Sequence, residues 1–467
     1  MPVHLRQFLI GPEPRLVRPD WRSTALSPGI HLSHCPTLPL RTDAAGMVLG
    51  DAIASGSGAD GPRTWAGRWV LLSGTRLQMD AGGLLGCFFR SSQTGFWVSS
   101  SPEILRELSP ELPLHADRLE RDWRLMDWYP PPHSAIAGIG RLLPSQVLQL
   151  TDGSVAARSL PGVDAGAAYE DILDRAGRRL VAAANGAAAV AAQQAGRIWV
   201  GLTGGRDSRL VLAAAVAAGV KPMTYTFIRA KTSPGDRELP PRLAAALGLE
   251  HIQIPMVEVD PQKASDFDRH TAFGFVGGAR TQYSTGGWDR VESSAVALEG
   301  GCFEFARGYY YGRLPSDMGG KVSRVVADVT ARFPTGRPAG VEAWADWILG
   351  AGRQADLDWR DRFYLEQRMG GWLSAGLQGF DISARRQIHI ANCDALLADL
   401  LNVPLAERRA GTHEAALVER LAPALAAFPY NPGSGGRSKG SGTQGKGRRA
   451  SRSLLDRIRG ASERRSG

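Results

Sequence analysis

Short apolar runs separated by glycine-containing turns dominate the first 160 residues of the chain. These runs lie at 69–72, 86–89, 96–99, 146–150 and 155–158. The last two are joined by Thr151-Asp152-Gly153-Ser154, a sequence that favours a tight hairpin turn. Because such runs and turns are typical of antiparallel hairpins, the pattern predicts a β-rich N-terminal domain.

From about residue 165 the pattern changes to an alternation of helical and strand segments. Apolar residues at helical spacing predict helices at 169–195, 207–218 and 236–247, and later at 364–368 and 395–401. Apolar, β-branched and aromatic runs predict strands at 198–200, 223–228 and 251–254. Strands that alternate with helices form a parallel sheet, so we expect an α/β protein with a domain boundary near residue 165.

The net charge of +9 lies almost entirely at the C-terminal end of the 467-residue chain. Residues 433–467 contain ten Lys or Arg, two acidic residues and many Gly and Ser. We therefore expect three parts: domains at 1–164 and 165–432 and a disordered basic tail at 433–467. The near-neutral body gives no support for a nucleic-acid surface, although a tail that binds DNA or RNA stays open.

Apolar runs and cysteines set the expected environment. No run of eighteen apolar residues predicts a membrane span, and the N-terminus does not resemble a secretory signal. The four cysteines are Cys35, Cys87, Cys302 and Cys393, which are too few and too scattered for a disulfide framework or a structural zinc site. We expect a cytoplasmic protein with reduced, buried thiols and no membrane partner.

The segment Thr203-Gly204-Gly205-Arg206-Asp207-Ser208 joins the strand predicted at 198–200 to the helix predicted at 207–218. Two glycines allow the backbone to curl until successive amides face one point, at the positive end of the helix dipole. No lysine follows the glycines and the GxGxxG spacing is missing, so neither common nucleotide motif fits. The segment therefore predicts a phosphate cradle of another kind.

This segment resembles the SGGxDS pyrophosphate loop of the ATP pyrophosphatase superfamily, with Thr203 in place of the first serine. Enzymes of that superfamily adenylate a substrate and release pyrophosphate. The resemblance implies an adenine nucleotide α-hydrolase-like synthetase domain that binds ATP and Mg²⁺, with Asp207 as a metal ligand. The residues implied to hold ATP at this loop are Leu202, Thr203, Gly204, Gly205, Asp207 and Ser208.

The N-terminal region resembles the glutaminase-type, Ntn-hydrolase-type domain of asparagine synthetases. The matching segments are 65–70, 80–83, 99–103, 138–139 and 142–146. In that family the second residue is a cysteine whose thiol attacks glutamine, whereas Pro2 stands here. The resemblance thus implies a degenerate glutaminase domain without glutamine hydrolysis, so the nitrogen would come from ammonia or an amine.

A second segment, Leu298 to Tyr309, resembles the asparagine synthetase motif SGEGxDELFGGY. Gly301, Glu304, Gly308 and Tyr309 match, whereas Phe303 replaces the aspartate that supplies a second magnesium carboxylate. The resemblance implies nucleotide binding at Gly300 and Gly301. Glu304 is a candidate substitute ligand for the metal, and an internal ion pair between Glu304 and Arg307 is the alternative.

Four further side chains have two open interpretations each. Phe227, at the end of a predicted strand, would contact adenine or belong to the core. Glu366 and Arg368 would reach the acceptor pocket, which the family builds from helices, or form salt bridges. Lys439 resembles the C-terminal lysine that stabilises charge in the relatives, or is one solvated lysine of a basic tail.

The resemblance implies an asparagine synthetase-like, ATP-dependent carbon–nitrogen ligase. A small-molecule or peptide carboxylate would form an acyl-adenylate with pyrophosphate release, and an amine or ammonia would then displace AMP. The candidate catalytic residues are Asp207, Glu304 and Lys439. The alternative is a catalytically degenerate ATP-binding or scaffold protein of the same fold, and a homodimer also stays open.

Overall fold

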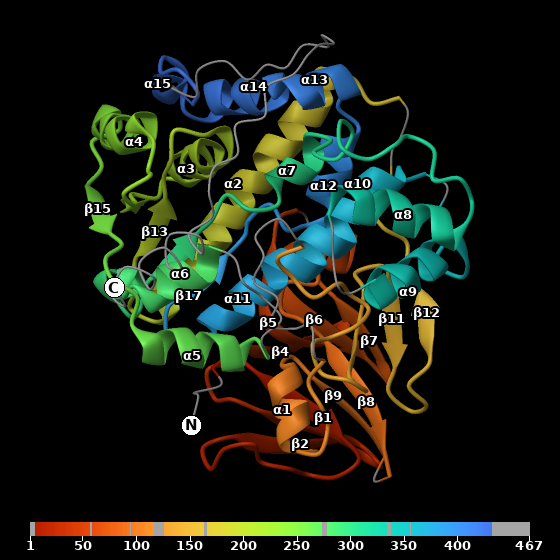
Figure 1. Cartoon of the computed structure of the whole chain (residues 1–467). Helices are drawn as coiled ribbons and strands as arrows, with labels where there is room; N and C mark the ends of the chain where they lie inside the picture. Colours follow the sequence, from red (N-terminus) through yellow and green to blue (C-terminus); the bar gives the residue numbers. More distant parts are fainter. Residues whose placement is uncertain are drawn as a thin grey trace, which may run out of the picture. The chain divides into compact units, whose positions relative to one another are not determined.

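The computed structural model describes residues 5–56, 58–93, 95–115, 126–162, 166–272, 278–333, 338–354 and 356–431. These residues all belong to one compact unit, which is shown in Figure 1. The domain boundary expected near residue 165 falls on residues 163–165, which lie outside the described residues. The tail expected at 433–467 also lies outside them.

Two antiparallel sheets form the N-terminal part. The first has the order β10 (Gly140–Arg141), β8 (Phe88–Ser92), β9 (Gly95–Ser99), β1 (Phe8–Gly11), β3 (Ile30–His34) and β2 (Arg22–Ser27). The second has the order β12 (Val155–Ala157), β11 (Gln146–Gln149), β7 (Arg76–Met79), β6 (Trp65–Ser73), β5 (Gly46–Ala54) and β4 (Leu40–Asp43). Side chains from both sheets, such as Ile10 and Val70, share one buried core. The predicted hairpins of β8 with β9 and of β11 with β12 are confirmed.

The third sheet is parallel and has five strands. Their order is β15 (His251–Pro255), β14 (Met223–Ile228), β13 (Ile198–Gly201), β16 (Val296–Leu298) and β17 (Arg386–Ile388). The chain runs outward from β13 to β15 and then returns to the other side of β13 as β16. Crevices for ligands form where the strand order reverses, at the carboxyl ends of the strands. The topology thus predicts a site between the loops that follow β13 and β16.

Helices account for most of the remaining described residues from 166 onward, and the antiparallel strands gather at the opposite end of the unit (Figure 1). The predicted helices at 169–195, 207–218 and 236–247 are confirmed as α2 (Tyr169–Gln193), α3 (Arg206–Ala217) and α4 (Pro234–Ala246). The other helices are α5 (Pro261–His270), α6 (Gly278–Ser284), α7 (Phe303–Ala306), α8 (Val322–Arg332), α9 (Pro338–Leu349), α10 (Trp359–Phe363), α11 (Ser374–Phe380), α12 (Asp394–Leu401), α13 (Leu405–Ala410), α14 (Thr412–Leu421) and α15 (Pro423–Ala426). Short helices occur in the N-terminal part as η1 (Gly58–Thr64) and α1 (Pro102–Glu107), and η3 (Gly287–Arg290) follows α6.

Between α10 and α11 the chain forms a ten-residue π-helix, η4 (Tyr364–Leu373). The residues predicted as helical at 364–368 lie in it. Because π-helical turns are rare and are frequent at functional sites, this segment is a structural signal that sequence periodicity does not give.

Buried ion pairs join the N-terminal sheets to the rest of the unit. The Asp381 carboxylate accepts hydrogen bonds from Arg68 at 2.9 and 3.1 Å and from the Nε of Arg6 at 3.2 Å. Burial alone would raise the pKa of Asp381, but the two guanidinium groups hold it below its ordinary value. Removing one partner would leave a buried charge unpaired, which is strongly destabilising. The N-terminal sheets are therefore bound firmly to the parallel-sheet part.

The described residues contain no helix that is both long and apolar enough to cross a membrane. All four cysteines are buried with free thiols, as expected.

Candidate functional site

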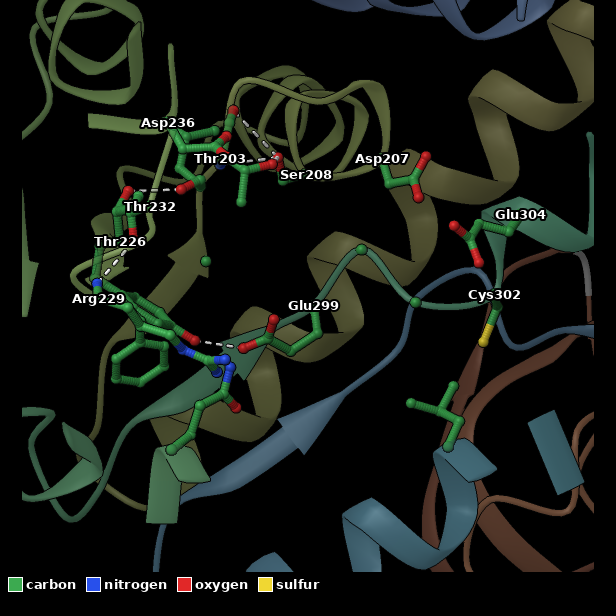
Figure 2. Close-up of a pocket in the computed structure, with 18 of the residues that line it drawn as sticks. Thr203, Asp207, Ser208, Thr226, Arg229, Thr232, Asp236, Glu299, Cys302 and Glu304 are labelled. Carbon is green, nitrogen blue, oxygen red and sulfur yellow. Dashed lines mark hydrogen bonds between the residues drawn. The ribbon is translucent and has the colours of Figure 1, made fainter. Parts of the chain in front are cut away.

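A cavity of about 650 Å³ lies at the carboxyl ends of β13, β14 and β16, at the reversal of strand order (Figure 2). Its lining comes from the loops after β13, β14 and β16, the end of β14, the start of α4 and the π-helix η4, with Met256 and Gln282 from beyond β15 and from α6. Of the candidates from the sequence, it includes Leu202, Thr203, Asp207, Ser208, Phe227, Gly300, Gly301, Glu304 and Arg368. Residues about 100 positions apart in the chain thus meet at one place, whereas Lys439 lies outside the described residues.

Side chains hold the loop between β13 and α3 in its shape. The Thr203 amide donates to the Ser208 Oγ at 3.1 Å, and the Gly205 amide donates to the Thr203 Oγ1 at 3.2 Å. Gly205 precedes α3, and its position supplies no side-chain cap for the first N–H groups of the helix. Uncapped N–H groups at the positive end of a helix dipole bind anions. The loop therefore has the geometry of a phosphate cradle.

A carboxylate of the protein already contacts this cradle. The Gly204 amide donates to the Asp236 Oδ1 at 2.8 Å, and Asp236 lies in the first turn of α4. The amide is thus directed at a place that an anionic oxygen can occupy. A phosphate oxygen that reached Gly204 would exchange with this carboxylate oxygen.

The last described residues of the chain lie on the back of the same loop. The Asn431 amide donates to the Gly204 carbonyl at 2.9 Å. Arg209, which is fully buried, donates to the carbonyls of Phe428 and Pro429 at 2.7 and 2.8 Å, and its guanidinium stacks on the Tyr430 ring. This strap, residues 428–431, fixes the position of the cradle and was not foreseen from the sequence.

Arg307 forms an ion pair with Asp207, the carboxylate that the resemblance assigns to magnesium. Its guanidinium binds both carboxylate oxygens of Asp207, at 2.5 and 3.0 Å, and lies 3.4 Å from the Glu304 Oε1. The phenylalanine that replaces the second metal aspartate, Phe303, is buried in the core. Among the described residues no group of three acidic, histidine or cysteine side chains is arranged to hold a metal ion. Because Arg307 contacts both Asp207 and Glu304, these two carboxylates are paired with arginine and are not arranged as an open magnesium site.

The cavity also contains a carboxyl group that sequence reasoning missed. Glu299 follows β16 and accepts a hydrogen bond from the Tyr225 hydroxyl of β14. Burial raises the pKa of Glu299 from 4.5 to about 7, and the hydrogen bond from Tyr225 lowers it in part. A carboxyl group with a pKa near 7 can accept or release a proton at neutral pH. The motif comparison did not single out Glu299, because its partner lies 74 residues away.

The structure separates the two candidates of the predicted acceptor pocket. Glu366 does not line the cavity; it is fully buried and accepts from the Trp344 Nε1 at 2.6 Å and the Arg362 Nε at 3.0 Å. Arg368 lines the cavity, and its guanidinium lies 3.7 Å from the Trp372 ring centre. No described residue pairs with the Arg368 guanidinium in an ion pair or hydrogen bond, and its buried Nε has no partner.

Phe227 fits both of its interpretations. It lines the cavity and is half-buried, and its ring also packs edge-to-face on Tyr225 and Trp288 at 5.4 and 5.5 Å. One part of the ring thus belongs to the core while another part is open to a ligand.

Comparison with known proteins adds no further assignment. No protein-family model matches the chain. No curated protein matches it either. The residues and geometry of the site therefore carry the functional argument.

Proposed function

We propose that this chain is an ATP-dependent carbon–nitrogen ligase of the asparagine synthetase type. A substrate carboxylate oxygen attacks the α-phosphorus of ATP, which forms an acyl-adenylate and releases pyrophosphate. An amine or ammonia then attacks the acyl carbon, and AMP leaves. In this proposal the nitrogen comes from free ammonia or an amine substrate.

One observation carries this proposal: the uncapped start of α3 lies at a cavity where the strand order reverses. The uncapped start of α3 would hold the pyrophosphate portion of ATP, together with the hydroxyl groups of Thr203 and Ser208. Phe227, at the end of the next strand, lines the cavity and would contact the adenine. Fixed donors of this kind stabilise charge that develops on a leaving group.

Two further side chains of the cavity lining, Arg368 and Glu299, support an acid and an amine as the other substrates. Arg368 lines the cavity with a guanidinium that stacks on Trp372 and has an unpartnered Nε, which suits an anionic group of the acid substrate. Glu299, with a pKa of about 7, suits removal of a proton from the attacking amine. Arg368 lies in η4, whereas Glu299 lies in the loop after β16. In this proposal the two side chains act on different parts of the reaction centre.

Exchange of labelled pyrophosphate into ATP tests the adenylation step across a panel of carboxylic acids. We expect exchange that depends on one class of acid and that falls about 10- to 100-fold in Ser208→Ala, because a hydrogen bond to a charged group contributes about 1.5–3 kcal/mol. Ser316→Ala, an exposed serine away from the cavity, is the matched control. Exchange that Ser208→Ala leaves unchanged would place the chemistry elsewhere.

A catalytically degenerate ATP-binding protein is the second candidate. The pairing of Asp207 with Arg307 favours it, since that carboxylate is not free for a metal. ATP binding without any exchange across a broad panel of acids would support this second function.

A further inference from the structure

Two carboxylates of the cavity lining, Asp207 and Glu304, belong to a cluster of three around the Arg307 guanidinium, which lies behind the lining together with Glu414. Asp207 begins α3, Glu304 lies in α7 and Glu414 in α14, and Arg307 reaches all three. In Figure 2 the carboxylates of Asp207 and Glu304 point toward one another across the upper right of the view. The helices α3, α7 and α14 thus bring three carboxyl groups to one place, and the Arg307 guanidinium supplies positive charge there.

The geometry of Arg307 is that of a fixed partner. Two parallel hydrogen bonds of 2.5 and 3.0 Å join it to the two carboxylate oxygens of Asp207. This is the strong, bidentate form of an arginine–carboxylate pair. A further N–H contacts the buried Glu414 at 3.5 Å. Arg307 itself is only 22% exposed. A divalent cation that bound Asp207 would have to displace this guanidinium and leave it without its main partner.

The neighbouring charges make such a displacement less favourable still. Arg206, adjacent to Asp207 on α3, adds a second positive charge that acts on the Asp207 carboxylate. Phe303 places an apolar ring, not a carboxylate, one residue before Glu304. Arg307 and Arg206 thus place two positive charges beside the Asp207 carboxylate.

We propose that the Arg307 guanidinium is the resident cation of this nucleotide site and occupies the place of a protein-bound metal ion. Asp207 then acts as a positioning residue that holds Arg307 beside the phosphate cradle. The inference rests on the proposed function for the identity of the nucleotide. The pairing of Asp207 with Arg307 in place of a metal ion does not depend on which nucleotide binds.

Binding of Mn²⁺ to the full chain, followed by the electron paramagnetic resonance signal of the free ion, tests the proposal. The titration is done with and without α,β-methylene ATP, which cannot release pyrophosphate. The proteins are wild type, Asp207→Asn, Arg307→Ala and the double variant. Arg324→Ala is the matched control, because it frees a carboxylate, Asp328, from a similar ion pair on the exposed side of α8.

We expect wild type and Asp207→Asn to bind Mn²⁺ within twofold of each other in both titrations. Arg307→Ala should gain a site at least tenfold tighter than any in wild type, and the double variant should lose it. Arg324→Ala should gain no such site.

Two results would overturn the proposal. One is a Mn²⁺ site in wild type that Asp207→Asn weakens tenfold or more, and the other is an Arg307→Ala protein that folds but gains no site dependent on Asp207. If circular dichroism shows that Arg307→Ala does not fold, the comparison of wild type with Asp207→Asn decides. Failure of the nucleotide analogue to bind would count against the proposed function, while the nucleotide-free titration would still test Arg307.

Discussion

Adding one methyl group at Gly300 should separate the two loops that form the candidate nucleotide site. A Cβ at this position would lie 2.9 Å from the Ser208 amide nitrogen and 3.0 Å from the Asp207 carbonyl carbon. Both are backbone atoms, so they cannot move aside as the end of a flexible side chain can. The backbone of Gly300 is not left-handed, so the substitution causes no strain of its own. The effect of Gly300→Ala therefore reports on the contact between the loops.

The size of the effect follows from that contact. Ordinary van der Waals contacts of a Cβ begin near 3.4 Å, so the loops must move apart by roughly half an ångström, and overpacking of this kind costs about 1–3 kcal/mol. Because the Ser208 amide belongs to the start of α3, the shift changes the cradle itself. If this cost falls on binding, the affinity for ATP should fall between about 5-fold and 100-fold.

Calorimetric titration of ATP into wild type and Gly300→Ala measures this loss. Gly312→Ala is the matched control, because an added Cβ there has no heavy atom within 4 Å and the backbone is not left-handed. Equal ATP affinity and equal melting temperature in Gly300→Ala and wild type would refute the reasoning. If wild type itself does not bind ATP, a melting temperature lowered in Gly300→Ala alone still tests the contact between the loops.

Two further predictions concern the cavity lining. The folded chain holds a proton on Glu299 up to a pKa of about 7, whereas an unfolded glutamate releases it near 4.5, so the unfolded state binds fewer protons between these values. The free energy of unfolding should therefore fall by up to roughly 3 kcal/mol as pH rises from about 4.5 to 7. Glu299→Gln should lack this part of the fall in urea denaturation at pH 5 and pH 7.5, and parallel profiles for the two proteins would contradict it. Arg368→Ala should raise the KM for the acid substrate about tenfold or more and leave the KM for ATP within twofold. The control variant Arg324→Ala should change neither KM. A change confined to the KM for ATP would show that Arg368 does not bind the acid.

Local sequence signals were enough to predict the elements that form the cradle. The apolar run at 198–200 and the alanine-rich segment at 207–218 correspond to β13 and α3, within one residue at each end. Two glycines lie between these predicted elements and mark a turn. The position of the loop could therefore be predicted from the sequence alone. Strand β14 was likewise predicted at its observed bounds, because its residues are apolar, aromatic or threonine and are bounded by turns.

The partners of the loop residues could not be predicted, because they are distant in the chain. Asp207 pairs with Arg307 across 100 residues, and Gly204 accepts from Asn431 across more than 200. Periodicity and turn signals describe neighbours within one element, whereas these pairs depend on which elements the fold brings together. The sequence did pose Glu304 and Arg307 as an alternative ion pair, and the structure places them at 3.4 Å.

Two of the departures from the asparagine synthetase motif, Phe303 and Arg307, change the charge of the site in the same direction. In the register of the resemblance, Phe303 stands where the motif has aspartate, and Arg307 stands where it has glycine, next to the matching Gly308 and Tyr309. Losing a carboxylate and gaining a guanidinium each raise the charge of the site by one. The sum equals the charge of one divalent cation, and the added guanidinium lies on the carboxylate, Asp207, that the motif assigns to the metal. Under the proposed function, the loss of the carboxylate alone would remove a metal ligand, whereas Arg307 in addition supplies a cation on Asp207.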